Sequence, residues 1–165
     1  MDKIYKNNFN LVYGYLYTLT NDHELAEELT QDTFYSAIKN ISKFKNQCSI
    51  STWLCAIAKN KYKSYLKKSR RFKMISYDES IESLLVENVF EENICDKEYV
   101  RRLYEEIHKL DDLAREVIYL KIQGGFTFGE IGKMLNKSEA WARVTFYREK
   151  TKLKEALLDE AESNM

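Results

Sequence analysis

The feature that most constrains the fold is a shortage of turn-forming residues, because the 165-residue chain contains no proline and only five glycines. Sheets that are built from short hairpins need such residues at many tight turns. A strand-rich fold is therefore disfavoured. Apolar residues make up 44% of the chain, enough to build one compact core or two small ones. The composition predicts an all-α protein.

Apolar residues recur at helical spacing in the N-terminal half. Residues 3–20 predict a first helix, and a second follows with Asn21 or Asp22 as its N-cap. The core stripe expected for the second helix is Leu25, Leu29, Phe34, Ile38 and Ile41. After a loop at 44–52, a third helix is expected to open near Ser51 or Thr52. Its expected core side is Trp53, Leu54, Ile57, Ala58, Tyr62, Tyr65 and Leu66.

The middle of the chain predicts a division into two domains. Residues 72–95 lose clear periodicity and are acidic, which indicates a flexible linker with at most a short helix near 80–90. Two small helical domains, residues 1–71 and 96–165, would lie on either side of it. The second domain is expected to begin with a helix over 96–110 and another that Asp111 or Asp112 caps and Gly124-Gly125 ends.

The formal net charge is zero, but the charge is unevenly distributed. Acids without Lys or Arg occupy 22–32, bases without acids occupy 59–73, and acids return over 78–98 against one lysine. The C-terminal bases are Arg143, Arg148, Lys150, Lys152 and Lys154. Such blocks are commonly solvated faces. Two basic blocks separated by an acidic segment also favour two contacts with nucleic acid.

The segments "TFGEIGKMLN" and "SEAWARVTFYREK" predict a short helix, a three-residue turn and a longer helix, as in a helix-turn-helix. Gly132 is expected where the helices approach, Asn136 in a left-handed turn and Ser138 at the N-cap. The expected inner contacts are Ile131, Leu135, Ala142 and Phe146. Arg143, Tyr147 and Arg148 would then face outward, where such side chains can read a major groove. An ordinary helical hairpin with a solvated basic face is the alternative.

Two more candidate surfaces lie in the N-terminal half. The loop residues Asn46, Gln47 and Ser49 precede a cationic ridge of Asn60, Lys63 and Lys67, a combination that can capture an unstacked base and grip its backbone. An acidic face suits a basic protein partner, with a plain solvated face as the equal alternative. That face consists of Glu24, Glu27, Glu28, Gln31 and Tyr35.

Several function classes are poorly supported. The three cysteines form no CxxC pair and the two histidines lie far apart, so no metal site is expected. The absence of a glycine-rich phosphate loop or nucleophile elbow argues against an enzyme, and no cofactor is expected. Without a signal peptide or an apolar run of roughly 18 residues, we expect a cytoplasmic protein that does not insert into membranes.

Three segments occur together in a characteristic order and spacing: "AEELTQDTF" (26–34), "FKNQCSISTWLCAIAKN" (44–60) and "FTFGEIGKMLNKSEAWARVTFYREK" (126–150). Through them, nearly the whole chain resembles the extracytoplasmic-function (ECF) sigma factors of the bacterial sigma-seventy family. The resemblance implies sigma region 2 in residues 1–71 and region 4 in residues 96–165. It implies binding to the β′ clamp and β subunits of core RNA polymerase and to promoter DNA, and control by an anti-sigma factor, often membrane-anchored.

Carried over by position, the resemblance implies three sets of site residues. Those for core polymerase are Glu27, Glu28, Gln31, Asp32 and Phe34. Those for the −10 element, including capture of a flipped base, are Asn46, Gln47, Ser49, Asn60, Lys61, Lys63 and Lys67. Those for the −35 element are Lys121, Ser138, Arg143, Val144, Tyr147 and Arg148.

The chain also departs from the family pattern. Gly132 stands where the family has a small alanine, and Ala140-Trp141-Ala142 replace a frequent Gly-Thr-Val, which leaves the preferred −35 sequence open. The sequence also fits two functions other than that of a sigma factor. A stand-alone helix-turn-helix regulator would use only residues 96–158 and bind duplex DNA without polymerase. A helical adaptor that binds only proteins would lose no activity when Arg143 and Tyr147 are replaced.

Overall fold

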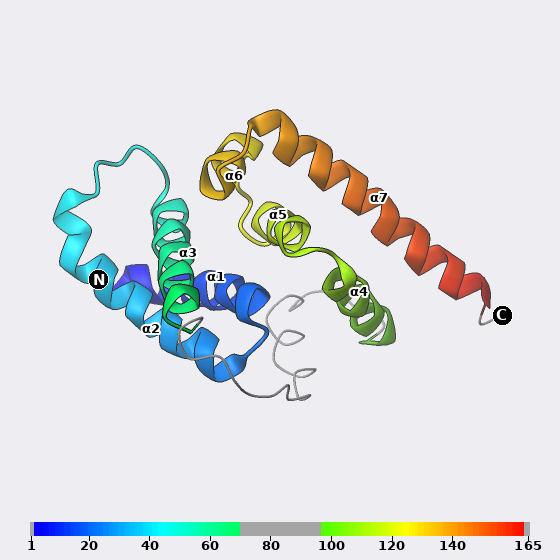
Figure 1. Cartoon of the computed structure of the whole chain (residues 1–165), viewed down its shortest axis with the longest axis horizontal. Coiled ribbons are helices and arrows are strands. Elements are labelled where there is room, and N and C mark those ends of the chain that lie inside the picture. The colour runs from blue at the N-terminus through cyan, green and yellow to red at the C-terminus, as the bar shows by residue number, and fades with distance from the viewer. Residues whose placement is uncertain (1, 70–96, 164–165) are drawn as a thin grey trace. The chain divides into compact units, whose positions relative to one another are not determined.

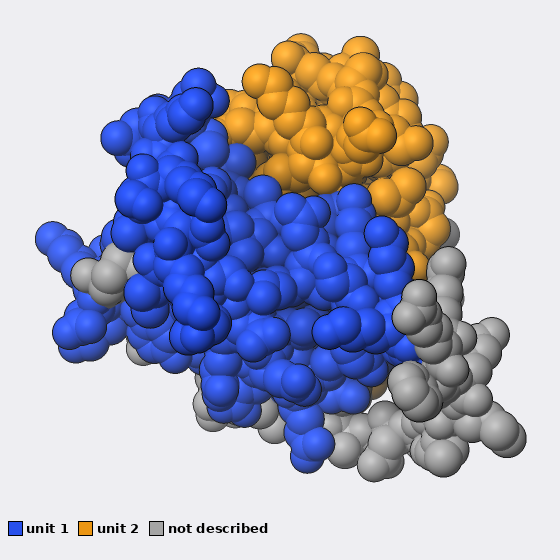
Figure 2. Space-filling view, turned by 60° about the vertical axis from the view of Figure 1, so that its left-hand side comes forward, with its two compact units in different colours: residues 1–81 blue, residues 82–165 orange. Residues whose placement is uncertain are grey.

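The computed structural model describes residues 2–69 and 97–163, and the regular structure within them is helical (Figure 1). This confirms the all-α prediction. The chain divides into two compact units, Met1–Ile81 and Glu82–Met165, which Figure 2 colours separately. The predicted linker, 72–95, and the short helix expected near 80–90 lie outside the described residues.

The described part of the first unit contains three long helices and one short turn of 3-10 helix. These are α1 (Asp2–Thr20), α2 (His23–Asn40), η1 (Ile41–Lys43) and α3 (Ile50–Ser69). Asn21, with φ of 52°, makes the left-handed turn that separates α1 from α2. The Asp22 side chain then accepts a hydrogen bond from the Leu25 amide at 3.0 Å, which caps α2 as predicted.

Each of α1, α2 and α3 packs against the other two, and their shared interior is the core of the first unit. The buried apolar side chains are Val12, Tyr15, Leu16, Tyr17, Ala26, Leu29, Phe34, Ala37, Leu54, Cys55 and Ala58. Thr30 and Thr33 are also buried, and each hydroxyl donates to the carbonyl four residues earlier at 2.7 Å. Small and hydroxylated residues therefore form much of the core side of α2.

Two residues assigned to the core by their apolar character are exposed. Ile38 is 52% exposed, because the buried side of α2 is centred on Thr33 and Ala37 and Ile38 lies about 100° away from Ala37. Tyr65 is 38% exposed. The buried residues of α3 all lie in its first half, so Tyr65 stands on a part of the helix that extends past the core.

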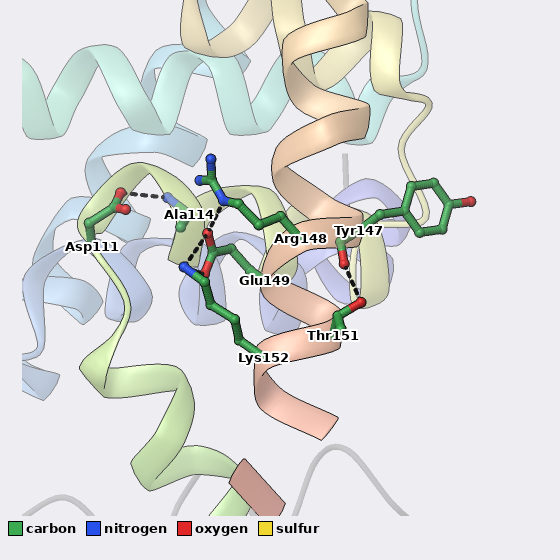
Figure 3. A network of polar contacts seen from close by, with 7 residues as sticks. All are labelled: Asp111, Ala114, Tyr147, Arg148, Glu149, Thr151 and Lys152. Carbon is green, nitrogen blue, oxygen red and sulfur yellow. Dashed lines mark hydrogen bonds and ion pairs between the residues drawn. The ribbon is translucent and has the colours of Figure 1, made fainter. Parts of the chain in front are cut away.

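The described part of the second unit contains α4 (Lys97–Lys109), α5 (Asp112–Ile122), α6 (Phe128–Leu135) and α7 (Glu139–Ser163). Asp111 caps α5 by accepting from the Ala114 amide at 3.0 Å (Figure 3). Gly125, with φ of +63°, follows the end of this helix as the sequence predicted. Thr127 and Glu130 form a reciprocal capping box at the start of α6.

The pair α6 and α7 forms the predicted helix-turn-helix. Asn136 adopts the left-handed conformation at φ 56° and ψ 46°. The Ser138 hydroxyl accepts from the Trp141 amide at 3.0 Å, which confirms its N-cap role. A Cβ added at Gly132 would lie 2.8 Å from the Lys137 carbonyl oxygen, so the close approach expected at this glycine is confirmed. The predicted inner contacts are all buried: Ile131, Leu135, Ala142 and Phe146.

We predict that Gly132→Ala destabilises the second unit by about 1–3 kcal/mol, the usual cost of overpacking, because its methyl group would press on backbone that cannot rotate away. Urea unfolding is measured by Trp141 fluorescence in a Trp53→Phe background. Gly129→Ala is the matched control, since a Cβ there meets no atom nearer than the Glu139 carboxylate oxygen at 3.4 Å. Equal unfolding midpoints for the two alanine variants would contradict the prediction.

Candidate nucleic-acid and protein interfaces

Near its start, α7 presents a narrow exposed face, which we call the recognition face: Arg143, Val144, Tyr147 and Arg148. Val144 and Tyr147 are 62% and 56% exposed. They point away from the buried side of α7, which carries Ala142 and Phe146. With 100° between successive residues, Arg143 falls on one flank of these two side chains and Arg148 on the other. A helix of this kind fits a major groove about 12 Å wide.

The Arg143 flank is organised by one aromatic ring that the sequence analysis did not single out. The Arg143 guanidinium lies 5.5 Å from the centre of the Phe128 ring, and the Lys121 ammonium lies 4.6 Å from it. The Tyr147 ring is 6.0 Å away. Phe128 thus contacts three residues of the predicted −35 set. In the sequence, Phe128 is marked only by its position directly after Thr127, the N-cap of α6.

Both cations on this flank have a second partner that limits their motion. Lys121 Nζ donates to the Phe126 carbonyl at 3.0 Å. Arg143 Nη2 donates to Glu139 Oε1 at 2.7 Å, one helical turn earlier. Glu139 therefore lies beside the guanidinium that the sequence assigned to base reading. Carboxylates can accept from the cytosine amino group, so the Glu139 side chain has chemistry suited to a base edge as well.

The Arg148 flank is organised by a buried acid. Arg148 Nε donates to Glu149 Oε1 at 2.6 Å, and Lys152 Nζ lies 3.2 Å from Glu149 Oε2 (Figure 3). The Glu149 side chain is only 4% exposed. In the same view Tyr147 points to the opposite side of α7, and its carbonyl accepts from Thr151. An aromatic ring, Phe128, therefore contacts the cations of the Arg143 flank, whereas a buried carboxylate, Glu149, pairs with those of the Arg148 flank.

In the first unit, a loop joins η1 to α3 and carries three of the predicted −10 residues in exposed positions. Asn46 has φ of 52°, a left-handed turn, and Gln47 follows it. Ser49 accepts from the Thr52 amide at 3.0 Å, so its hydroxyl caps α3. The helix accordingly begins at Ile50, one or two residues earlier than predicted.

The position of this loop is set by two contacts at its ends. The Phe44 and Trp53 rings pack with centres 5.0 Å apart and close the base of the loop. The Ser51 hydroxyl donates to Asn8 Oδ1 at 2.7 Å, and the Asn8 amide group donates to the Ile4 carbonyl at 2.8 Å. Asn8 is 5% exposed, so this polar link between α1 and α3 is shielded from water. Nothing in the local sequence pattern marked Asn8.

Along α3, the three residues of the predicted cationic ridge are all exposed, whereas Lys61, the other predicted −10 residue on this helix, is not. Asn60, Lys63 and Lys67 are exposed and recur every three or four residues, so they share a side of the helix. Lys61 is about 100° from Asn60 and is only half-buried, with its ammonium 3.9 Å from Asp32 Oδ2 of α2. Lys61 and Asp32 were assigned to different partners and lie within ion-pair distance.

On α2, four of the five predicted polymerase-binding residues are exposed: Glu27, Glu28, Gln31 and Asp32. Phe34 is 4% exposed and packs on Tyr5 with ring centres 4.7 Å apart, so its side chain lies in the core rather than on the surface. Tyr35 is 58% exposed on the acidic side, beside the exposed Ile38. This side of α2 is therefore acidic and partly apolar.

Other reactive chemistry is sparse in the described residues. Within 2–69 and 97–163, no group of three or more His, Cys, Asp or Glu side chains could hold a metal ion. None of the helices in those ranges has the length and apolar character that a membrane crossing requires. Cys48 is exposed in the loop, whereas Cys55 is buried, and burial raises the pKa of the Cys55 thiol to about 12.

Comparison with known proteins gives consistent relatives. The model of the family "Sigma-70 region 2" matches residues 4–72. The ECF RNA polymerase sigma factor SigM of Bacillus subtilis (strain 168) is 30% identical over 154 residues, which cover 93% of this chain and 93% of SigM. RNA polymerase sigma factor YlaC of the same strain is 25% identical over 156 residues, covering 93% of this chain and 90% of YlaC.

A solved structure shares the fold. The sigma factor RpoE from Bartonella quintana, in complex with the anti-sigma factor NepR, superposes with a TM-score of 0.73 at 19% identity, covering 96% of each chain. The helices, the match to region 2 and the 30% identity over nearly the full length of SigM lead to one conclusion. The chain belongs to the extracytoplasmic-function family of RNA polymerase sigma factors.

Proposed function

We propose that this sigma factor binds core RNA polymerase and directs it to promoters through two separate DNA contacts, without catalysis of its own. Residues 1–71 would act as region 2, residues 96–165 as region 4 and residues 72–95 as their linker. One observation carries the proposal beyond family membership: the exposed surfaces differ in chemistry. An acidic, partly apolar side of α2 and two cationic surfaces, on α3 and α7, suit a protein partner and DNA respectively.

The α2 surface is the proposed contact with the β′ clamp of polymerase, and further contact with the β subunit is part of the proposal. Glu27, Glu28, Gln31 and Asp32 would supply its polar groups, and Tyr35 with Ile38 would supply apolar area. Interfaces of this kind gain most of their affinity from a few buried aromatic or apolar anchors. Phe34 would contribute indirectly, by holding α2 on α1 through Tyr5.

The loop before α3 is the proposed site for a flipped base of the −10 element. Asn46 and Gln47 are exposed there and offer amide groups that pair with base edges, while Ser49 anchors the loop as a cap. Asn60, Lys63 and Lys67 would follow the strand backbone along α3. Capture of the base offsets an unstacking cost of a few kcal/mol. Lys61 would join them after it leaves Asp32.

The recognition face of α7, with Lys121 and Ser138 beside it, is the proposed contact with the −35 element. Arg143 is supported by Phe128 and Glu139 and would read base edges, while Arg148 would bind phosphate. Control by an anti-sigma factor that covers the polymerase-binding surface is also part of the proposal, as is action in the cytoplasm. The proposed control by an anti-sigma factor is supported by the solved relative RpoE, which is in complex with the anti-sigma factor NepR.

The first experiment is run-off transcription with purified core polymerase on a promoter pool, with and without this protein, followed by sequencing of the transcript starts. We expect new starts that share two spaced motifs. Duplex DNA shifted by the protein alone, without new starts, would instead support the stand-alone regulator. The absence of both signals would support an adaptor that binds only proteins.

A second prediction separates the two roles. Arg143→Ala removes a base-reading group on α7 and is expected to lower transcription from the recovered promoters by about fivefold or more, because a bidentate arginine–guanine pair contributes about 1–3 kcal/mol. Core binding in a pull-down should remain unchanged, because Arg143 is far in sequence from the α2 surface. Tyr35→Ala is the reciprocal variant, with weakened core binding expected. A loss of core binding in Arg143→Ala would contradict this separation.

A third prediction uses the natural thiols. Cys48 lies between Gln47 and Ser49 in the loop and is exposed, so iodoacetamide should modify it readily in the free protein. Promoter DNA bound to the holoenzyme should slow this reaction severalfold. Cys55 is the internal control, because its buried thiol should stay unmodified throughout. Peptide-resolved mass spectrometry measures both. An unchanged Cys48 rate with a bound promoter would argue against the loop as the −10 contact.

A further inference from the structure

Glu149 is an acid embedded in a cationic part of α7, and neither the sequence pattern nor the proposed function uses it. Its side chain is 4% exposed, whereas those of its neighbours Arg148 and Lys152 are 53% and 61% exposed. A carboxylate at this depth loses most of its hydration and is stable as an anion only when it is well paired. Arg148 Nε at 2.6 Å and Lys152 Nζ at 3.2 Å provide that pairing.

The geometry of the Arg148 contact leaves the outer end of the side chain available. The hydrogen bond to Glu149 uses Nε, the nitrogen nearest the backbone. In Figure 3 the two terminal nitrogens of the guanidinium point away from the carboxylate. Because the guanidinium is planar and rigid, a bond at Nε orients the whole group. The terminal N–H groups are then left as a fork that can donate to a further acceptor.

The chemistry of that acceptor follows from what surrounds the fork. Lys152 is one helical turn from Arg148 and shares its carboxylate, so two cations are held on the same flank of α7. A fork beside a second cation suits the anionic oxygens of a nucleic-acid phosphate. Phosphate contacts fix the register of a protein on duplex DNA.

We propose that Glu149 is a positioning residue of the −35 interface. It holds Arg148 and Lys152 as a phosphate clamp on one DNA strand, and so sets the register in which Arg143, Val144 and Tyr147 meet the bases. This inference rests on the proposed contact between α7 and the −35 element. Glu149 would affect DNA binding by orienting Arg148 and Lys152, without contacting the DNA itself.

The simpler alternative is a buried ion pair that only stabilises the helix. The two roles predict different effects on the preference for promoters that carry a −35 element. Removal of a negative charge near DNA should by itself strengthen binding to every sequence. A loss of whole folded molecules should weaken use of all promoters in equal proportion. Neither effect lowers the ratio between a promoter with its −35 element and one without it, whereas loss of register does. Unfolding of the second unit alone would also lower the ratio, so the clamp requires Glu149→Gln to keep the urea midpoint of Trp141 fluorescence.

The test uses holoenzyme formed with the full chain carrying Glu149→Gln. The DNA probes are the strongest promoter from the run-off pool and the same promoter with its −35 hexamer scrambled. We expect the ratio of initial transcription rates on these probes to fall about fivefold, within the range of measured couplings between contacting residues. Glu155→Gln is the matched control, because it makes the same charge change at an exposed position of α7 and should keep the ratio.

A mutant cycle shows whether the effect passes through the two clamped cations. In an Arg148→Ala, Lys152→Ala background, Glu149→Gln should cause no further fall in the ratio; multiplying losses would overturn the clamp. A ratio unchanged by Glu149→Gln but lowered by Arg143→Ala would overturn this inference and leave the proposed function standing. If Arg143→Ala also leaves the ratio unchanged, α7 does not read the −35 element and both proposals fail.

Discussion

The contact on which the second unit depends is the approach of the α6 backbone to the turn before α7. At Gly132 the Lys137 carbonyl and the Ser138 backbone occupy the space that any other side chain would need. Asn136 supplies the left-handed residue of the turn and Ser138 the cap, so each position of the connection is fixed by a separate requirement. Because this contact sets the direction of α7, it also determines which side chains form the recognition face.

On both candidate DNA surfaces, several polar groups are already held by neighbouring residues in the free protein. Phe128 collects Lys121 and Arg143, Glu149 collects Arg148 and Lys152, and Asn8 anchors the start of α3 behind the loop. A long side chain that is free in solution loses about 0.5–1.5 kcal/mol of conformational freedom when it is fixed in an interface. Side chains that are already held lose less, which favours both affinity and a single binding geometry.

Much of the helical fold was predictable from local sequence, because caps and turns involve neighbouring residues. Asp22, Asp111, Asn136 and Ser138 all act as their residue types suggested. The errors at Ile38 and Tyr65 have another cause. Apolar periodicity does not indicate that alanines, and threonines whose hydroxyls are hydrogen-bonded, form much of the core side of α2. It also does not indicate where a helix extends past its neighbours.

Site residues were harder to predict where their role depends on contacts distant in sequence. The link between Asn8 and Ser51 joins positions 43 residues apart, and no local pattern marks it. Phe128 and Glu149 looked like an ordinary aromatic residue and an ordinary acid until their partners were known. Phe34 is the opposite case. The family resemblance implied that it contacts polymerase, but its side chain packs against Tyr5 in the core of the first unit.

The ion pair between Lys61 and Asp32 has a thermodynamic consequence under the proposed assignments. Its lysine is assigned to promoter DNA and its aspartate to polymerase, and the two groups are 3.9 Å apart. Whichever partner binds first breaks the pair and releases the other residue, so each macromolecule lowers the cost of binding the next. Reciprocity requires the two effects to be equal. A partly exposed pair contributes at most about 1 kcal/mol, so this linkage amounts to roughly fivefold and weakens as salt increases.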